Sequence, residues 1–379
     1  SRINNAQLKA ASAHESEYDA QRQELISLDY SRTPDETFSI LDRFVRNITR
    51  QEFERWIAEG RFETKIVEGH LRFSDRSVGN LVYRYPDIAA RYAYPSDYLQ
   101  LKTEILADVR TIKAEARQRH KRFVLPKRFH VSLSVKLNSG VLVTPSSRVR
   151  AWIPIPLSTS SQFDVELKSL SSPAVSVSDA SLPIRSVYSE LTPSANQSVQ
   201  FDMSYEYRSN AISCDLVDSL IQPYNPADSA YWAFVSEGPH ISFSDSVRTL
   251  VRNLSGTSTN SAQKARSIYN WISENIKYGV PPRYNVTHDI GNNCLVQGYG
   301  DCAHTALLFI SLCRSAGIPA RWQSGWITRP RATTVHAWAE ILLLPYGWVP
   351  VDPYMGIFAM QYFHGPLDER REIRDFHFG

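Results

Sequence analysis

The sequence predicts an α+β, multidomain protein, and three observations support this fold class. Residues 1–127 show apolar residues at helical spacing, and residues 128–222 contain short segments of strand type. Residues 223–379 contain helical patterns first and strand patterns after them, an order typical of an α+β unit. We therefore expect an N-terminal helical region over 1–127, a β-sandwich domain over 128–222 and a C-terminal α+β domain over 223–379.

The composition is that of a water-soluble globular protein. Of the 379 residues, 42% are hydrophobic and 21% are charged, and the formal net charge of +3 gives no general attraction to nucleic acid. We therefore expect no nucleic-acid partner, and we attribute the basic run at 117–122 to the exposed end of a helix. No apolar run approaches the ~20 residues of a membrane span. Because the chain begins at Ser1 rather than Met, we expect an exported protein (periplasmic, cell-surface or secreted) that has lost its signal peptide.

The clearest helix of the N-terminal region begins near 95–97. Pro, Ser and Asp at these positions are helix-start residues. Apolar residues then recur at steps of three and four and predict one buried stripe, formed by Leu101, Ile105, Val109, Ile112 and Ala116.

The second region is rich in β-branched and aromatic residues, and clusters of Ser, Asn, Gly and Pro divide it. This pattern is typical of an antiparallel β-sandwich. The expected strands are "HVSLSVKL" (130–137), "VRAWIPIP" (149–156), "FDVELKSL" (163–170) and "SVQFDMSYEY" (198–207).

A cysteine stands at a predicted helix start in the third region. The stretch "GYGDCAHTALLFISLC" (298–313) has Asp301 as an N-cap candidate, and Gly317 can end the apolar helix that follows. Cys302 would lie in the first turn, where free backbone N–H groups and the helix dipole favour a thiolate, although the charge of Asp301 opposes it. Cys313 lies far along the same helix and is expected to be structural. Cys214 and Cys294 are expected to be structural too, or to form a disulfide.

A predicted hairpin supplies a base for this thiol. In "TTVHAWAEILLLPYGWVPVDP" (333–353), polar and apolar residues alternate on both sides of a Pro-Tyr-Gly turn. A hairpin centred on Leu344 would place His336 directly opposite Asp352. A carboxylate at that position can fix the imidazole tautomer and leave the other ring nitrogen for a thiol. Cys302, His336 and Asp352 together predict an activated cysteine nucleophile.

The segment from Lys264 to Pro353 resembles the transglutaminase-like core, a papain-like fold of cysteine enzymes. The motifs that carry the resemblance are "ARSIYNWISENIKYG", "GYGDCAHTALLFISLCRSAGIPARWQSGW" and "VHAWAEILLLPYGWVPVDP". The resemblance implies Cys302 as nucleophile, His336 as general base and acid, and Asp352 as the residue that orients His336. "VRAWIPIP" also resembles the β-domain that precedes this core in bacterial relatives. Metazoan relatives have Trp where Ala303 stands and acidic calcium sites, so we expect neither calcium nor another cofactor here.

Further site residues and the reaction remain open at this level. The backbone N–H of Cys302 is expected to stabilise an oxyanion, and Gln297 is the side-chain candidate, with a plain loop amide as the alternative. His304 is either a second site residue or a polar helix-start residue, and a zinc site from Cys294, Cys302 and His304 lacks a common ligand spacing.

The expected chemistry is acyl transfer from a peptide or carboxamide through a thioester. Water as acceptor makes a peptidase or amidase, which we favour. An amine as acceptor makes a transglutaminase with the same triad. A catalytically silent binding or surface module is the alternative from another class. A peptide or protein partner is expected in each case, and the oligomeric state is not indicated.

Overall fold

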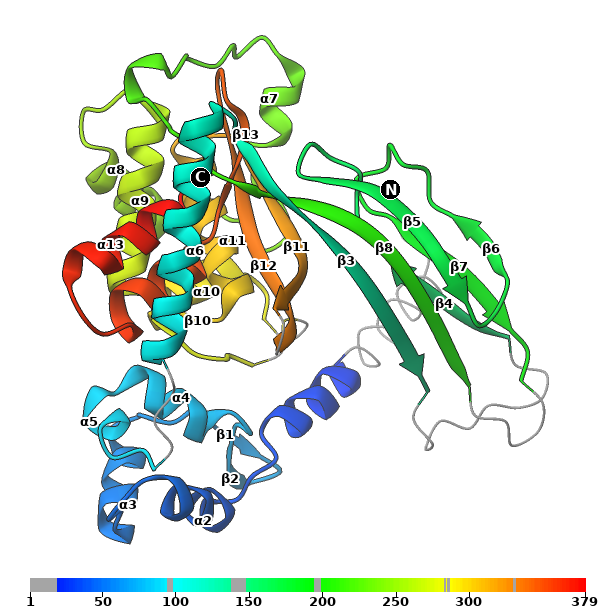
Figure 1. Cartoon of the computed structure of the whole chain (residues 1–379). Helices are drawn as coiled ribbons and strands as arrows, with labels where there is room; N and C mark the ends of the chain where they lie inside the picture. The colour runs from blue at the N-terminus through cyan, green and yellow to red at the C-terminus, as the bar shows by residue number, and fades with distance from the viewer. Residues whose placement is uncertain are drawn as a thin grey trace, which may run out of the picture. The chain divides into compact units, whose positions relative to one another are not determined.

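The structure is a computed structural model that describes residues 19–93, 98–137, 148–193, 199–282, 284, 287–329 and 332–379. It contains helices together with several antiparallel sheets, which confirms the α+β class (Figure 1). Contacts divide the described residues into two compact units. One holds the residues up to Leu106 together with Leu216–Gly379, and the other holds Ala107–Asp215. The contacts thus group the N-terminal region with the C-terminal region, and the three predicted domain boundaries stay a prediction.

The N-terminal region of the first unit is mostly helical but contains a hairpin that the sequence analysis missed. The hairpin turns at Glu68 and Gly69, whose φ values of 50° and 77° both lie in the left-handed region. Two such residues form the two-residue turn that matches the twist of paired strands, so "EG" between two apolar segments was a usable signal. The elements here are helical residues 19–29, α2 (Pro34–Phe44), α3 (Arg50–Ala58), β1 (Thr64–Val67), β2 (His70–Phe73), α4 (Ser77–Arg84) and α5 (Pro86–Ala89).

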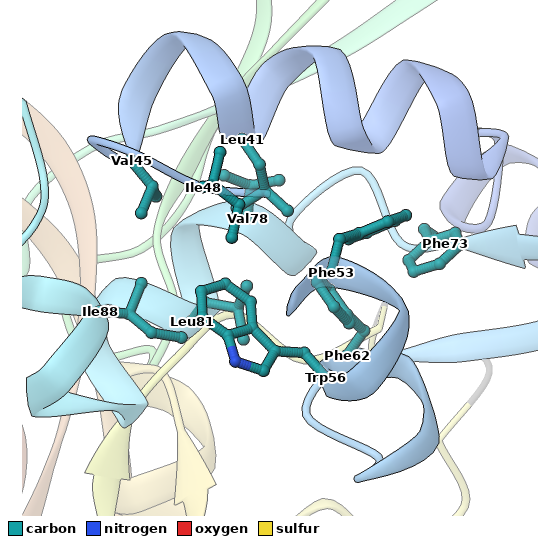
Figure 2. Close-up of a cluster of buried hydrophobic side chains, with 10 residues drawn as sticks. All are labelled: Leu41, Val45, Ile48, Phe53, Trp56, Phe62, Phe73, Val78, Leu81 and Ile88. Atoms are coloured by element: carbon teal, nitrogen blue, oxygen red, sulfur yellow. The ribbon is translucent and has the colours of Figure 1, made fainter. Parts of the chain in front are cut away.

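A cluster of buried apolar side chains holds these elements together (Figure 2). Phe53 and Trp56 from α3 lie at its centre, and both are almost fully buried. The ring of Phe53 lies 5.8 Å from that of Phe73 on β2 and 5.3 Å from that of Phe62. Burial of each such side chain contributes about 1.5–3 kcal/mol, so the cluster gives this region a core of its own.

The N-terminal region also contacts the segment that leads to Cys302. Asn80 of α4 is buried, and its side chain bonds the backbone of Val280 in both directions, donating to the carbonyl at 3.0 Å and accepting from the N–H at 2.7 Å. Tyr83 packs edge-on against Tyr278, with ring centroids 4.6 Å apart. These contacts fix the strand pair β9 (Lys277–Tyr278) and β10 (Tyr299–Gly300) beside α4.

Helix α6 (Tyr98–Arg119) carries the predicted apolar stripe. Ile105, Val109 and Ala116 are buried, whereas the predicted helix start at 95–97 lies outside the described residues. The basic residues at its end are exposed, as predicted, and cations there interact favourably with the helix dipole. None of the helices in the described part of the chain combines the length and the hydropathy needed to cross a bilayer.

The C-terminal part of the first unit surrounds one buried helix. Helix α11 (Cys302–Ser315) is buried from Ala303 to Cys313, and it packs against α8, α9, α10 and the sheet strand β12. Helix α9 contains the first motif of the resemblance, and its Ala265, Ile268 and Ile272 are buried. The elements are η1 (Asp218–Leu220), α7 (Ser229–Ala233), α8 (Asp245–Ser255), α9 (Ser261–Asn275), α10 (Ile290–Gln297), β11 (Ala320–Arg329), β12 (Ala332–Leu343), β13 (Gly347–Val351), α12 (Pro353–Ile357), η3 (Phe358–Tyr362) and α13 (Leu367–Phe376).

The second unit consists mainly of strands. Among its described residues, β3 (Phe123–Lys136), β8 (Gln200–Ile212) and β5 (Gln162–Leu170) form one antiparallel sheet, and β4 (Val149–Pro154), β7 (Ser186–Leu191) and β6 (Ala174–Val177) form another. Four of these strands overlap the predicted segments, and the sequence analysis missed β6 and β7. Ile153 and Val187 from one sheet share a buried cluster with Met203 and Tyr205 from the other. The β-sandwich itself stays a prediction.

Candidate active site

Cys302 begins α11, as the sequence predicted. Asp301 is the N-cap: its backbone is extended, and its side chain accepts a hydrogen bond from the backbone N–H of His304 at 3.1 Å. Cys302 is half-buried and a free thiol. The first turn of α11 therefore presents this thiol at the positive end of the helix dipole.

The other cysteines occupy different environments. Cys294 and Cys313 are buried, and burial raises the pKa of both thiols well above the usual range. Cys214 is half-buried, and burial also raises the pKa of its thiol despite a nearby arginine. All four cysteines are free, so the Cys214–Cys294 disulfide that the sequence left open is wrong. Thiols whose pKa is raised react slowly as nucleophiles at neutral pH.

The register of the predicted hairpin was wrong by two residues, but the error left His336 and Asp352 on the same face of the sheet. Ala339 pairs with Val351 and Leu343 with Gly347, so the hairpin centres on Pro345 rather than on Leu344. His336 thus lies diagonally across from Asp352 rather than directly opposite it. A two-residue shift preserves the alternation of side chains, so both still lie on one face. His336 Nε2 lies 2.7 Å from Asp352 Oδ2.

Two elements hold the Asp352 carboxylate in place. Asp352 follows the last residue of β13 and is the N-cap of α12, where its Oδ1 accepts a hydrogen bond from the Met355 N–H at 3.2 Å. Its backbone N–H donates to the His377 carbonyl at 2.9 Å. The remaining oxygen, Oδ2, faces His336. The cap therefore orients the carboxylate before it meets the imidazole.

His336 contacts both Asp352 and Cys302. Burial alone would lower the pKa of His336, because the charged ring loses hydration. Hydrogen bonds to Asp352 and to the Cys302 thiol outweigh burial and raise the pKa to about 10. Since Nε2 bonds Asp352, Nδ1 is the ring nitrogen left for the thiol. The structure thus brings Cys302, His336 and Asp352 into one connected set of hydrogen bonds.

An aromatic wall that the sequence analysis did not identify lies beside this set. Tyr354 of α12 packs edge-on against His336, with ring centroids 5.3 Å apart, and lies 5.5 Å from the ring of Tyr278 on β9. Burial, with Asp301 and Cys302 nearby, raises the pKa of Tyr278 to about 12. These phenols are therefore neutral at physiological pH and form a partly apolar surface beside the thiol.

Gln297 does not join the set. It is the last residue of α10, its side chain is exposed, and it lines a cavity of about 400 Å³ together with Arg22, Tyr30 and Lys65. Cys302 is not among the residues that line this cavity. The geometry therefore gives no support to Gln297 as an oxyanion donor.

His304 lies in the first turn of α11, as the helix-start alternative predicted, and it is fully buried. Its Nδ1 lies 2.8 Å from Asp301 Oδ1, and Asp301 Oδ2 accepts a hydrogen bond from the Tyr284 hydroxyl at 2.7 Å. Within the described ranges, no three His, Cys, Asp or Glu side chains gather in a way that could hold a metal ion. The zinc alternative thus has no ligand cluster among those residues.

The sequence of this core matches a known family. Residues 248–353 match the family model of the transglutaminase-like superfamily. This segment is a transglutaminase-like domain. The match covers the thiol helix α11, the whole sheet β11-β12-β13 and Asp352, and it agrees with the resemblance drawn from the motifs.

Several solved structures are similar to the chain at low sequence identity. A candidate cysteine protease from Cytophaga hutchinsonii is similar over 61% of this chain and 79% of its own, with 21% identity and a TM-score of 0.45. The periplasmic domain of TgpA from Pseudomonas aeruginosa is similar over 69% of this chain and 95% of its own, with 14% identity and a TM-score of 0.32. A candidate protease from Parabacteroides distasonis is similar over 59% of this chain and 40% of its own, with 17% identity and a TM-score of 0.24. No curated protein matches the chain.

Proposed function

We propose that the protein is a cysteine-dependent acyl-transfer enzyme that cleaves peptide or carboxamide bonds through a thioester. Cys302 is the nucleophile, His336 is the general base and acid, and Asp352 orients His336. The observation that carries the proposal is that His336 bonds Asp352 through Nε2 at 2.7 Å and also shares a hydrogen bond with the Cys302 thiol. A nucleophile, a base and an orienting carboxylate in this order are what acyl transfer needs.

The resting site holds an ion pair in this proposal. With a pKa of about 10, His336 is protonated at neutral pH and can pair with a thiolate at Cys302. The helix start further favours the thiolate. The nucleophile is therefore formed before substrate arrives.

The first half-reaction forms the thioester. The thiolate attacks the carbonyl carbon, a C–S bond forms, and the carbonyl oxygen becomes an oxyanion that the backbone N–H of Cys302 can stabilise. The proton on Nδ1 of His336 passes to the substrate nitrogen. The C–N bond then breaks, the amine leaves, and the acyl group remains on the sulfur of Cys302.

The second half-reaction releases the acyl group. His336, now neutral, takes a proton from water, and the resulting hydroxide equivalent attacks the thioester carbon. The C–S bond breaks, a carboxylic acid leaves, and the thiolate–imidazolium pair is restored. We propose water as the acceptor because it needs no binding site of its own.

The experiment compares wild-type protein with Cys302→Ala, using β-casein as substrate and mass spectrometry as the readout. Cys313→Ala is the matched control, since it is the same substitution in the same helix at a buried thiol. Hydrolysis predicts new peptide termini or deamidated glutamine in wild type and in Cys313→Ala, and neither in Cys302→Ala. Cleavage that persists in folded Cys302→Ala would overturn the proposal.

A second arm adds monodansylcadaverine as an acceptor amine. If the probe becomes attached to casein glutamines and little hydrolysis occurs, the acceptor is an amine and the enzyme is a transferase. If casein stays unchanged and Cys302 is alkylated by iodoacetamide no faster than an ordinary thiol, the domain is a binding module. An exported location, in line with the periplasmic domain named above, stays part of the proposal, and fractionation of the source cells tests it.

A further inference from the structure

A negative charge lies immediately beside the proposed nucleophile. Asp301 precedes Cys302, and its side chain is only 15% exposed, so water screens its charge weakly. A carboxylate near a thiolate disfavours the thiolate and works against the mechanism proposed above. Asp301 nevertheless has to be there, since it caps α11.

His304 binds this carboxylate twice. Its backbone N–H donates to Asp301 Oδ1 at 3.1 Å, and its Nδ1 lies 2.8 Å from the same oxygen. The Tyr284 hydroxyl occupies the other oxygen at 2.7 Å. Burial acts to raise the pKa of Asp301, but the bonds from His304 and Tyr284 outweigh it and leave the pKa below its usual range. The carboxylate thus stays charged and is held by donors on both oxygens.

Among the described residues, the imidazole of His304 has no hydrogen-bond partner other than Asp301. The side chain is fully buried, and its Nε2 finds no hydrogen-bond partner among them. A buried nitrogen without a partner costs stability, so an apolar side chain would suit this position better if packing were its only role. Its bond to Asp301 is what distinguishes histidine from such a side chain.

Close packing surrounds the start of α11 at His304. A Cβ at Gly300 would collide with Cβ of His304 and approach Sγ of Cys294 to 2.9 Å. Gly300 has no left-handed backbone angle, so close approach rather than turn geometry requires glycine there. The second glycine of "GYGDC" therefore lets Cβ of His304 and Sγ of Cys294 lie close to the backbone before Asp301.

We propose that His304 is a positioning residue for Cys302, which donates its Nδ1–H to Asp301 and offsets the charge that would otherwise oppose the thiolate. This inference rests on the proposed function, because it concerns the same nucleophile. The groups that act on Cys302 come from several elements, so the test must separate His304 from the rest. These groups are His336, Asp352, Asp301, His304, Tyr278, Tyr284 and Tyr354.

The experiment measures the rate of alkylation of Cys302 by iodoacetamide from pH 4 to pH 10, with peptide mapping to identify the modified cysteine. Four variants are compared with wild type: His304→Ala, His304→Asn, Asp301→Asn and the double variant Asp301→Asn/His304→Ala. Asparagine at 304 keeps an N–H donor near the Nδ1 position, and asparagine at 301 keeps the helix cap without the charge. Near-UV circular dichroism and thermal melts identify variants that fold.

In His304→Ala, the pH midpoint of alkylation should rise by about one unit, which lowers the rate below the midpoint about tenfold. His304→Asn should lie close to wild type, and the double variant should return to the wild-type midpoint or below it. A folded His304→Ala protein with the wild-type profile overturns the inference, as does a double variant that stays shifted. If His304→Ala does not fold, Asp301→Asn decides: a midpoint at or below wild type supports the inference, and a rise overturns it.

The wild-type profile separates this inference from the proposed function. A midpoint well below the value of about 8.5 of an ordinary thiol supports the ion pair of the proposed mechanism. If the wild-type midpoint is low and the His304 variants have the same midpoint, the role of His304 is refuted and the proposed function stands. If the wild-type alkylation midpoint is that of an ordinary thiol, both the proposed function and this inference are refuted.

Discussion

Asp352 offers a sharp test because its two carboxylate oxygens have separate tasks. Oδ2 bonds His336 Nε2 at 2.7 Å, and Oδ1 caps α12 through the Met355 N–H at 3.2 Å. Asp352→Asn keeps one oxygen, which can still cap the helix, and places an amide –NH₂ toward the imidazole. The amide cannot accept the ring N–H and carries no charge. Asp352→Ala removes both the bond to His336 and the cap of α12, so its difference from Asp352→Asn measures the cap.

The expected magnitude follows from the geometry. Opposite charges about 4 Å apart interact by ~4 kcal/mol at an effective dielectric constant of about 20, which bounds the effect from above. In a serine enzyme with the analogous arrangement, Asp→Asn lowers turnover by about 10⁴. A thiol needs its base less than a hydroxyl does, so Asp352→Asn should lower acylation by about 10–10³, or ~1.4–4 kcal/mol in activation free energy. His336→Ala should be worse, because it removes the proton carrier.

The same bond should make stability depend on pH. Because the folded protein holds the pKa of His336 at about 10, above the ~6.5 of an unfolded chain, the pairing stabilises the fold fully below about pH 6.5. This contribution is lost as the pH rises through about 10. His336 is mostly buried, so we expect Asp352→Asn to lower the free energy of unfolding by about 1.5–3 kcal/mol at pH 6. The difference from wild type should shrink toward pH 10.

Two measurements check the prediction for Asp352. The burst of p-nitrophenol from p-nitrophenyl acetate reports acylation of Cys302, and urea unfolding at pH 6, 8 and 10 reports stability. Asp352→Ala should lose about 1 kcal/mol beyond Asp352→Asn at every pH, since only alanine loses the cap. A folded Asp352→Asn protein that acylates at the wild-type rate would remove Asp352 from the mechanism and leave at most a Cys–His dyad.

Three further changes test the framework of the site. Cys313→Ala should cost about 1 kcal/mol in urea unfolding, because the thiol is fully buried, and it should leave the acylation burst unchanged. Gly356→Ala should destabilise the protein by about 1–3 kcal/mol or more, because the new methyl group collides with Ser273 Oγ, and a wild-type melting temperature would contradict this. Asn80→Ala should cost about 2–3 kcal/mol, since it leaves both backbone groups of Val280 without their buried partner, and hydrogen exchange at that amide should become faster.

Local signals in the sequence predicted the position of Cys302 in the fold well. An N-cap aspartate, an apolar run and a Gly–Pro stop define α11 through contacts within a few residues, so the sequence alone places Cys302 in its first turn. The prediction that His336 and Asp352 lie together depended on a weaker signal. Alternation placed both on one face, but the number of residues in the turn sets the register, and here the paired residues Leu343 and Gly347 leave three residues between them.

Contacts between distant segments could not be predicted from the sequence. The role of Gly300 depends on the close approach of Cβ of His304 and Sγ of Cys294, and the aromatic wall depends on Tyr278 and Tyr354 meeting from different elements. Gln297 was a candidate because papain-like enzymes often use a Gln about five residues before the cysteine, and here it lies at the end of α10, with β10 between it and Cys302, and lines a separate cavity. Sequence distance is a poor guide wherever a strand or turn changes direction between two residues.

Two helix caps supply the fixed negative charges of this site. Asp301 caps the nucleophile helix and Asp352 caps α12, and each has one oxygen bound to a backbone N–H of its helix and the other oxygen bound to a side chain. The two charges have opposite consequences for an ion pair between Cys302 and His336. Asp352 binds His336 and stabilises its imidazolium. Asp301 opposes the thiolate and binds a different histidine, His304. If the caps were needed for helix ends alone, asparagine would serve at both positions and neither pH profile of alkylation would shift. Because the two charges act oppositely on the ion pair, we expect the profiles of Asp301→Asn and Asp352→Asn to shift in opposite directions.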